Sequence, residues 1–144
     1  MLVRRMQSND IEQVSRLCEQ FGYPASQEEI EERFRHLQQM HEHQVFIVEQ
    51  NTAIVGWIQA HGIHSLSSPP YVEIRGIVVD REYRQQGVGR LLMNAAEQWA
   101  LEHEYSIVRL RSNAQRPESH QFYPKLGYER TKTQYHYQKQ LTKS

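Results

Sequence analysis

The pattern of apolar and polar positions predicts short strands and amphipathic helices in the first half of the chain. Apolar residues recur every three or four positions between residues 11 and 21, which is the spacing of one face of an α-helix. A second helix is predicted to begin after Ser26, because Ser26 and Glu29 have the spacing of a capping box. Strand-like segments flank these helices at residues 2–5, 45–49 and 53–59, and the last two are joined as a hairpin.

The second half of the chain alternates strands with helices. Residues 71–79 form an apolar, β-branched segment typical of a buried strand, and residues 88–102 are rich in strong helix formers. A strand, a short helix and a final strand follow, at residues 106–112, 117–122 and 128–139. Two strands joined through a helix imply a right-handed crossover and a parallel pair. The predicted fold class is therefore α/β, with a mixed sheet.

Length and composition are consistent with one domain that has no charge bias. A chain of 144 residues can bury one sizeable core, so residues 1–144 are expected to form a single domain. Lys and Arg together number 17, as do Asp and Glu, so no net field favours nucleic acid or an anionic membrane. Cys18 is the only cysteine, which fits a reducing cytoplasm. We expect a cytoplasmic protein without a signal segment, a membrane span or a nucleic-acid partner.

The most informative segment is the loop Arg-Gln-Gln-Gly-Val-Gly at residues 84–89, between a predicted strand and a predicted helix. Free backbone N–H groups at the positive end of a helix dipole bind phosphate or pyrophosphate. Glycine allows the backbone to approach such a ligand closely. Leu92 stands where a dinucleotide fingerprint needs glycine or alanine, and Arg90-Leu91 replaces the Lys-Ser/Thr of a P-loop. The loop therefore predicts an anion site of neither of these two types.

The pattern Arg-x-x-Gly-x-Gly after an apolar strand resembles the acetyl-coenzyme A loop of the GNAT N-acetyltransferase superfamily. Downstream, a strand ending in Ser-Asn is followed by Phe-Tyr-Pro-Lys-Leu-Gly-Tyr at residues 122–128, which is similar to the second half of the GNAT core. Two motifs in this order are more specific than either alone. The resemblance covers nearly the whole chain. It implies a mixed, mostly antiparallel sheet with about four helices and a splayed parallel strand pair at the coenzyme site.

The resemblance implies acetyl-coenzyme A as the cosubstrate and indicates the residues that bind it. The acyl and pantetheine groups would lie along the strand backbone at Ile77, Val78 and Val79, although packing in the core explains these apolar residues equally well. Asn113 would contact pantetheine or orient the loop, although asparagine at a strand end is also an ordinary turn residue. The pyrophosphate would be held by the loop and the start of the helix, at Arg84, Gln85, Gln86, Gly87, Val88, Gly89 and Arg90.

The resemblance also implies a general base. Acetyl transfer to an amine requires the amine to lose a proton, and the matching position is Glu73, four residues before Ile77 on the same predicted strand. Alternation places Glu73 on the same face as Arg75, Ile77 and Val79 unless a bulge intervenes. The alternative role for Glu73 is an ion pair, either with Arg75 or with a residue on a neighbouring strand.

Tyr123 matches the family tyrosine that donates a proton to the leaving thiolate. A phenol holds its proton at neutral pH, so it can supply that proton as charge develops on sulfur. The alternative is an aromatic side chain that only packs beneath the fourth helix. Pro124 departs from the family pattern, because proline is unfavourable inside a helix. It predicts that the helix ends or bends near Phe122, which would move the hydroxyl group of Tyr123.

The acceptor side is implied by the family to lie between the first two helices. Phe21 and Tyr23 are therefore candidate substrate-binding residues, together with Glu73 and Arg75, and the nearby acidic run at residues 28–32 would attract a cationic amine. The pairs His41/His43 and His61/His64 lack a third ligand at metal-site spacing, so no metal is predicted. The resemblance implies a homodimer through residues 135–137, although their alternation is also that of an ordinary strand without a function.

The leading hypothesis is an acetyl-coenzyme A-dependent N-acetyltransferase that acts by direct transfer in a ternary complex. The acceptor would be an amine of a small molecule or peptide. A catalytically silent acyl-coenzyme A-binding sensor or partner module is the alternative from a different class. A generic nucleotide-binding α/β domain is a third option.

Overall fold

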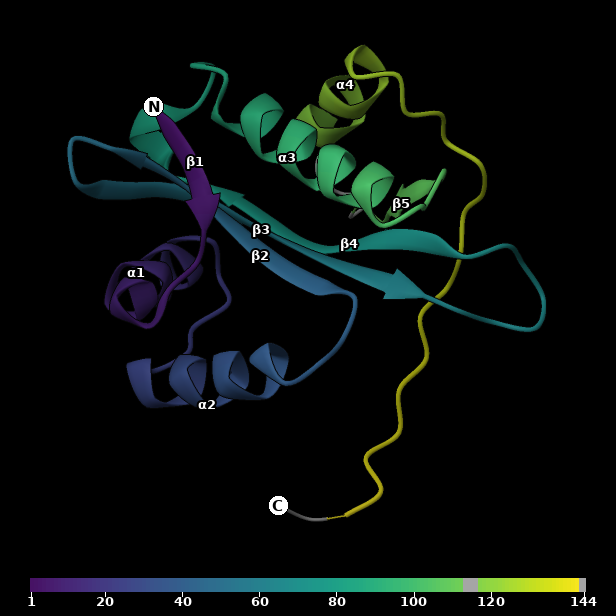
Figure 1. Cartoon of the computed structure of the whole chain (residues 1–144), viewed down its shortest axis with the longest axis horizontal. Helices are drawn as coiled ribbons and strands as arrows, with labels where there is room; N and C mark the ends of the chain where they lie inside the picture. Colours follow the sequence, from purple (N-terminus) through teal and green to yellow (C-terminus); the bar gives the residue numbers. More distant parts are fainter. Residues whose placement is uncertain (113–116, 143–144) are drawn as a thin grey trace. The chain divides into compact units, whose positions relative to one another are not determined.

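The computed structural model describes residues 1–112 and 117–142 and has an α/β fold (Figure 1). Within the described residues, one sheet has the strand order β1-β2-β3-β4-β5. Neighbouring strands are antiparallel, except for the parallel pair β4 and β5. The mixed, mostly antiparallel sheet expected from the sequence is confirmed. The strands are β1 (Leu2–Arg5), β2 (His43–Gln50), β3 (Ala53–Ile63), β4 (Tyr71–Val79) and β5 (Val108–Leu110).

The described chain also forms helices close to the predicted positions. They are α1 (Ile11–Gln20), α2 (Gln27–Gln38), α3 (Val88–Glu102) and α4 (Pro117–Lys125), with single 3-10 turns η1 (Ser8–Asp10) and η2 (Arg81–Tyr83). The chain divides into two units, Met1–Arg111 and Ser112–Ser144. The first unit holds the sheet with α1, α2 and α3, and the second holds α4. A single domain over residues 1–144 stays a prediction.

The two faces of the sheet are covered by different helices (Figure 1). On one face, α1 and α2 close over a buried apolar cluster, whose members are Met6, Ile11, Val14, Leu17, Cys18, Phe34, Val45, Ile47, Ile54 and Val78. On the other face, α3 approaches β3 at Gly56, where a Cβ atom would stand only 2.9 Å from Val88 and 3.1 Å from Leu92. The absence of a side chain at Gly56 therefore lets α3 lie close against the sheet.

Local sequence signals account for several element boundaries in the first unit. The backbone N–H of Glu29 donates to the hydroxyl of Ser26 at 3.1 Å, and the N–H of Ser26 donates to the Glu29 carboxylate at 3.0 Å. This is the predicted capping box of α2. Asn51 and Thr52 join β2 to β3 with φ values of 51° and 67°, as a tight hairpin turn of type I′ requires. The predicted hairpin is thus confirmed, with longer strands than expected.

The second unit differs from the sequence prediction in two ways. α4 does not end near Phe122 but continues through Pro124 to Lys125. The helix ends just after Pro124, where the carbonyl of Tyr123 accepts bonds from the N–H groups of Leu126 at 3.0 Å and Tyr128 at 3.1 Å, as in a helix C-cap. A bend of the helix near Phe122 stays a prediction.

The predicted final strand over residues 128–139 is wrong, because residues 128–142 contain no strand. Tyr135 and Tyr137 are 86% and 89% exposed. Leu141, which continues the same alternation, is 85% exposed, and no strand of the described residues pairs with this segment. Alternation alone therefore did not determine a strand here.

Candidate functional site

The parallel pairing of β5 with β4 ends part-way along β4. The paired residues are Val72 with Val108, Glu73 with Arg109 and Ile74 with Leu110. β4 itself continues to Val79. Beyond Ile74, the edge of β4 that faces away from β3 therefore has no strand partner among the described residues. Backbone N–H and C=O groups on such an edge are available to a ligand. This is the splayed parallel pair expected at the coenzyme site.

A β-bulge at Arg75 lies at the point where the two parallel strands separate. Gly76 is opposite Gln59 of β3, and Ile74 is opposite the next residue, Ala60. Arg75 therefore has no counterpart on β3. An extra residue of this kind reverses the alternation of the strand that follows.

Because of the bulge, the prediction that Glu73 shares a face with Ile77 and Val79 is wrong. Regular alternation places Glu73 with Ile77 and Val79, but after the bulge Glu73 shares its face with Val78. Val78 belongs to the apolar cluster covered by α1 and α2. Glu73 is therefore on the same side of the sheet as α1 and α2, whereas Ile77 and Val79 have their side chains on the α3 side.

The bulge also determines which backbone groups face the open edge. The N–H of Val72 donates to the segment just before β5 at 2.9 Å, and the N–H of Asp80 donates to β3 at 2.9 Å. In a regular strand these two even-numbered residues would face the same neighbour. Because the alternation changes at the bulge, Ile77 and Val79 direct their backbone groups toward the open edge. Those of Val78 face β3.

The first turn of α3 lacks a side-chain cap. Gly87 is the N-cap residue, with φ of 87° and nothing within 4 Å of the position that a Cβ atom would take. The first intrahelical bond runs from Leu91 N to Gly87 O at 3.0 Å. The amides of Val88, Gly89 and Arg90 therefore precede the helical ladder. No acidic side chain lies in this turn, so the positive end of the helix dipole suits an anion.

The loop before α3 is held against the end of α1. Arg81 donates from its backbone N–H to the side chain of Gln20 at 2.8 Å, and from its guanidinium to the Gln20 carbonyl at 2.9 Å. The guanidinium of Arg84 lies 5.0 Å above the ring of Phe21, within cation–π range. Gln85 has a positive φ of 62°. Val88 is buried, and the remaining predicted pyrophosphate contacts are exposed or half-buried: Arg84, Gln85, Gln86, Gly87, Gly89 and Arg90.

Glu73 forms the ion pair that the sequence left open as its alternative role. A guanidinium nitrogen of Arg75 donates to Glu73 Oε1 at 2.5 Å. The side chain of Glu73 is 12% exposed and that of Arg75 is 55% exposed. The Glu73 carboxylate is thus largely shielded from solvent, whereas the Arg75 side chain extends into the solvent. An ammonium group of a substrate could replace the guanidinium at this carboxylate.

The other predicted site residues occupy different parts of the chain. Phe21 is half-buried beneath Arg84, which places it beside the glycine loop. Tyr23 is 57% exposed. Tyr123 belongs to the second unit, where its ring meets Phe122 edge-to-face at 5.1 Å, and burial raises the pKa of its hydroxyl group. Asn113 lies outside the described residues.

Sequence reasoning did not identify the neighbours of Glu73 on the adjacent strands. His61 of β3 and Arg109 of β5 lie directly opposite Glu73. Arg109 also has its guanidinium 4.2 Å from the centre of the Tyr71 ring. Strand register brings these residues together, and no sequence motif reports register across a bulge.

Neither a membrane span nor a metal cluster occurs among the described residues. No helix there is long and apolar enough to cross a membrane. No group of three or more His, Cys, Asp or Glu side chains in this part of the chain could hold a metal ion.

Comparisons with known proteins agree with the loop and the fold. Residues 10–128 match the model of the acetyltransferase (GNAT) family. An uncharacterized N-acetyltransferase of Methanocaldococcus jannaschii is 30% identical over 98 residues, which are 67% of this chain and 43% of that protein. An uncharacterized N-acetyltransferase of Bacillus subtilis is 30% identical over 91 residues, which are 62% of this chain and 64% of that protein. The chain thus spans less than two thirds of either relative.

A solved structure gives the same fold. It is that of the aminoglycoside N-acetyltransferase AAC(6')-Iy in complex with CoA. Its TM-score is 0.85 at 21% identity, over 96% of this chain and 93% of that one. At this identity, the likeness establishes the fold alone.

Proposed function

The chain belongs to the acetyltransferase (GNAT) family, and on that premise we propose that it transfers an acetyl group from acetyl-coenzyme A to an amine. One observation carries the proposal. The open edge of β4 beyond Arg75 is followed in the chain, after the loop at residues 80–87, by the first turn of α3, which has no side-chain cap. A ligand with a pyrophosphate and an amide-bearing arm would find donors for the phosphates at one end and strand groups for the arm at the other.

The chain's own groups fit such a ligand. The amides of Val88, Gly89 and Arg90 supply donors, and Gly87 leaves space beside them. The backbone groups of Ile77 and Val79 would hold the pantetheine arm and aim the thioester. Acetyl-coenzyme A supplies the activated acyl group, and the protein supplies position and proton transfer.

Glu73 is proposed as the general base for the amine and Tyr123 as the acid for the thiolate, in a direct transfer within a ternary complex. Glu73 lies on the side of the sheet that faces α1 and α2, together with the proposed acceptor residues near Phe21. An amine bound there would compete with Arg75 for the carboxylate. The acceptor is proposed to be a cationic amine of a small molecule or peptide, because a carboxylate attracts an ammonium group.

The silent-sensor alternative is favoured by the same ion pair. If Arg75 stays on Glu73 in the presence of acceptor, no base is free and the chain would only bind the coenzyme. The two functions make the same prediction for binding and opposite predictions for turnover.

A combined binding and turnover experiment tests the proposal. Calorimetry with coenzyme A should give a one-to-one complex, and a thiol-release assay with a panel of a polyamine, an aminoglycoside and a peptide amine should give product. Tyr123→Phe and Glu73→Gln should each lower kcat by about 100-fold with unchanged coenzyme affinity, because a positioned acid or base contributes at least this factor. The matched controls are Tyr137→Phe and Glu12→Gln, at exposed positions outside the proposed site. Binding without turnover, and no effect of Glu73→Gln, would establish the sensor function.

Location and assembly are proposals as well. We expect the protein in the cytoplasm and as a homodimer, with the exposed segment around Tyr135 and Tyr137 at the contact between copies. Sedimentation of the full chain and of a variant with both tyrosines changed to serine would test this, since only the first should sediment as a dimer.

A further inference from the structure

Glu73 and Arg109 lie side by side on one face of the sheet, where β4 and β5 are paired. Arg109 is the register partner of Glu73 in the parallel ladder, and such partners direct their side chains to the same face. A second contact agrees with this placement. The Arg109 guanidinium lies 4.2 Å from the centre of the Tyr71 ring, and Tyr71 shares a face with Glu73 because it lies two residues earlier on the regular part of β4.

This group of side chains carries more positive than negative charge. Arg75 donates to the carboxylate of Glu73 at 2.5 Å. Arg109 forms no ion pair with a carboxylate in the part of the chain that the structure describes. One carboxylate therefore stands beside two guanidiniums, and one positive charge is left over. An anionic group on a ligand would neutralise it.

The exposed fractions of these side chains show how a ligand reaches them. Arg75 is 55% exposed and Glu73 is 12% exposed, and Arg109 is exposed as well. Both guanidiniums are thus open to a ligand from solvent. An ammonium group that binds Glu73 takes the place of Arg75 at the carboxylate.

Two kinds of amine differ in what this exchange does to the charges. An amine without an anionic group brings another positive charge next to two guanidiniums and leaves Arg75 without its partner. An α-amino acid brings a carboxylate on the carbon that carries its amine. It therefore gives the displaced guanidinium a new partner and adds no net charge. The excess of positive charge favours the amino acid over the simple amine.

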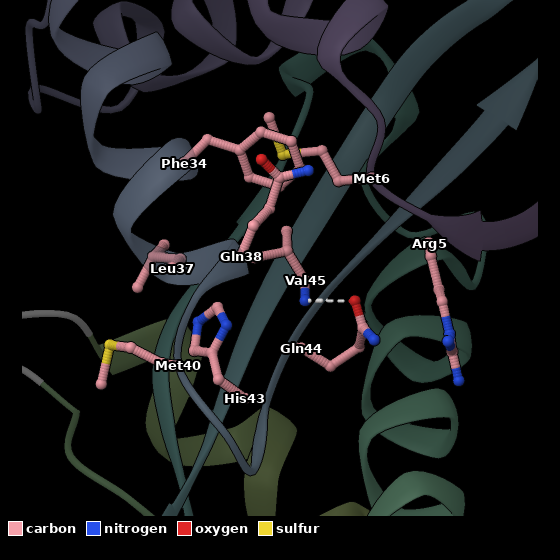
Figure 2. A pocket seen from close by; sticks show the side chains of 9 residues that line it. All are labelled: Arg5, Met6, Phe34, Leu37, Gln38, Met40, His43, Gln44 and Val45. Carbon is pink, nitrogen blue, oxygen red and sulfur yellow. Dashed lines mark hydrogen bonds between the residues drawn. The ribbon is translucent and has the colours of Figure 1, made fainter.

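The cavity between α2 and the start of β2, a space of about 290 Å³, offers no alternative place for that carboxylate. Arg5 is the one arginine among the described residues that line it (Figure 2). Figure 2 shows the side chain of Arg5 directed away from Phe34 and Met40. Arg5 also belongs to β1, three strands from Glu73 in the sheet, which is about 14 Å at the usual strand spacing. The two charged groups of an α-amino acid do not span that distance.

We propose that the acceptor is an α-amino acid, whose ammonium group binds the carboxylate of Glu73 while its own carboxylate binds the guanidinium groups of Arg75 and Arg109. The inference rests on the proposed acetyl transfer and names the class of acceptor for it. Arginine suits this task because its planar guanidinium can bind both oxygens of a carboxylate.

The reaction yields the N-acetyl amino acid. A bond forms between the amine nitrogen and the acyl carbon as the C–S bond of the thioester breaks. The ammonium loses two protons in all, of which one ends on the coenzyme thiol and one in solvent. The acetylated nitrogen carries no charge, so it no longer competes for Glu73. Arg75 can then return to the carboxylate, which restores the ion pair seen in the structure and favours release of the product.

A thiol-release assay tests the acceptor class by comparing each standard amino acid with its α-amide, in which an uncharged carboxamide replaces the carboxylate. We expect kcat/KM to be about 10- to 100-fold higher for the best amino acid than for its amide, the range expected for hydrogen bonds to a charged group. The amide has the less basic amine, so basicity alone would favour the amide. A polyamine, which bears no anion, should also react more slowly than the best amino acid.

Variants assign the preference to the two arginines. Arg75→Gln and Arg109→Gln should each reduce the ratio of kcat/KM between amino acid and amide, mainly through the KM of the amino acid, and the double variant should abolish it. Arg75→Lys should keep part of the preference, because it keeps the charge. The matched control is Arg16→Gln, at an exposed position on α1, which should retain the full preference. Calorimetry with coenzyme A should give the wild-type affinity for every variant, which shows that each is folded.

A binding measurement supports the assay without turnover. In calorimetry on the protein saturated with coenzyme A, the best amino acid should bind at least about tenfold more weakly to Arg75→Gln than to the wild type. Equal kcat/KM for amino acids and amides, or a preference that survives in the double variant, would overturn the amino-acid acceptor while acetyl transfer itself still stands. Coenzyme A binding with no amine acetylated would instead remove the proposed function, and this inference with it.

Discussion

Replacing Gly62 with alanine should destabilise the protein more than its place in a strand suggests. A Cβ atom at Gly62 would overlap the hydroxyl oxygen of Tyr105 and stand 2.7 Å from its ring carbon Cζ. Tyr105 is only 4% exposed and stacks on Trp99 with ring centroids 6.4 Å apart. Its hydroxyl group is 3.1 Å from His64 Nε2, which is also 2.9 Å from Glu42 Oε2. The ring therefore cannot move aside without loss of these contacts.

The magnitude follows from two contributions. Forcing one extra methyl group into a packed core costs about 1–3 kcal/mol, and loss of the Tyr105 hydrogen bond adds about 0.5–1.5 kcal/mol. We expect Gly62→Ala to lower the free energy of unfolding by about 2–4 kcal/mol. Urea unfolding at pH 7 would measure this as a lower midpoint with an unchanged slope.

A double-mutant cycle with Tyr105→Phe makes the reasoning refutable. The Tyr105→Phe variant would lack the overlapping oxygen, so Gly62→Ala should cost about 1 kcal/mol less in that background, within the usual range for residues in contact. An equal cost in both backgrounds, or a cost below about 0.5 kcal/mol in the wild type, would contradict the packing argument.

The same tyrosine gives a pH dependence. Burial, together with the hydrogen bond and charge of Glu42, raises the pKa of Tyr105 from 10.0 to about 12. The folded protein therefore holds this proton more tightly than the unfolded chain does. The resulting stability is fully present below about pH 10 and is lost as the pH rises toward 12. Unfolding measured from about pH 9 to pH 12 should show this loss in the wild type. Tyr105→Phe should lack that component.

Three further predictions concern other parts of the fold. Arg4→Met should cost about 3 kcal/mol in urea unfolding. It would leave the carboxylate of Asp10, only 4% exposed and now bonded to Arg4 through both oxygens at 2.8 Å, buried without its partner; a wild-type midpoint would contradict this. Ser26→Ala should cost about 1 kcal/mol through loss of the α2 cap, and a helix content and midpoint equal to wild type would refute it. Gly87→Ala should lower the free energy of unfolding by about 1–2 kcal/mol, because alanine disfavours the φ of 87°. The same change should weaken coenzyme A binding in calorimetry, and an unaltered affinity would show that this loop does not bind the coenzyme.

Local sequence signals predicted much of the first unit correctly, for identifiable reasons. The α2 capping box involves residues three positions apart, so the sequence alone specifies it. The hairpin between β2 and β3 and the helical spacing of α1 are equally local. Free backbone donors at the start of α3 could be predicted because the N–H groups in the first turn of a helix lack intrahelical partners. The binding of an anionic ligand to this loop stays a prediction.

Other features depended on contacts that no local pattern records. The helix α4 includes Pro124 and ends at Lys125, where the carbonyls of Tyr123 and Pro124 accept the closing bonds. Residues 128–142 formed no strand although Tyr135, Tyr137 and Leu141 alternate, because a strand also requires a neighbouring strand to pair with. Both errors came from applying a local rule where packing decides the outcome.

The sequence by itself determined the order of most elements, the capping box of α2, the turn between β2 and β3, and the prediction of an anion site in the loop before α3. Only the tertiary structure decided the bulge at Arg75, the face occupied by Glu73 and the register that sets Glu73 opposite His61. The physical reason is that a one-residue change in register moves every following side chain to the opposite face of a sheet. Register is fixed by the packing of all the strands and helices together, so it has no signature within any one segment.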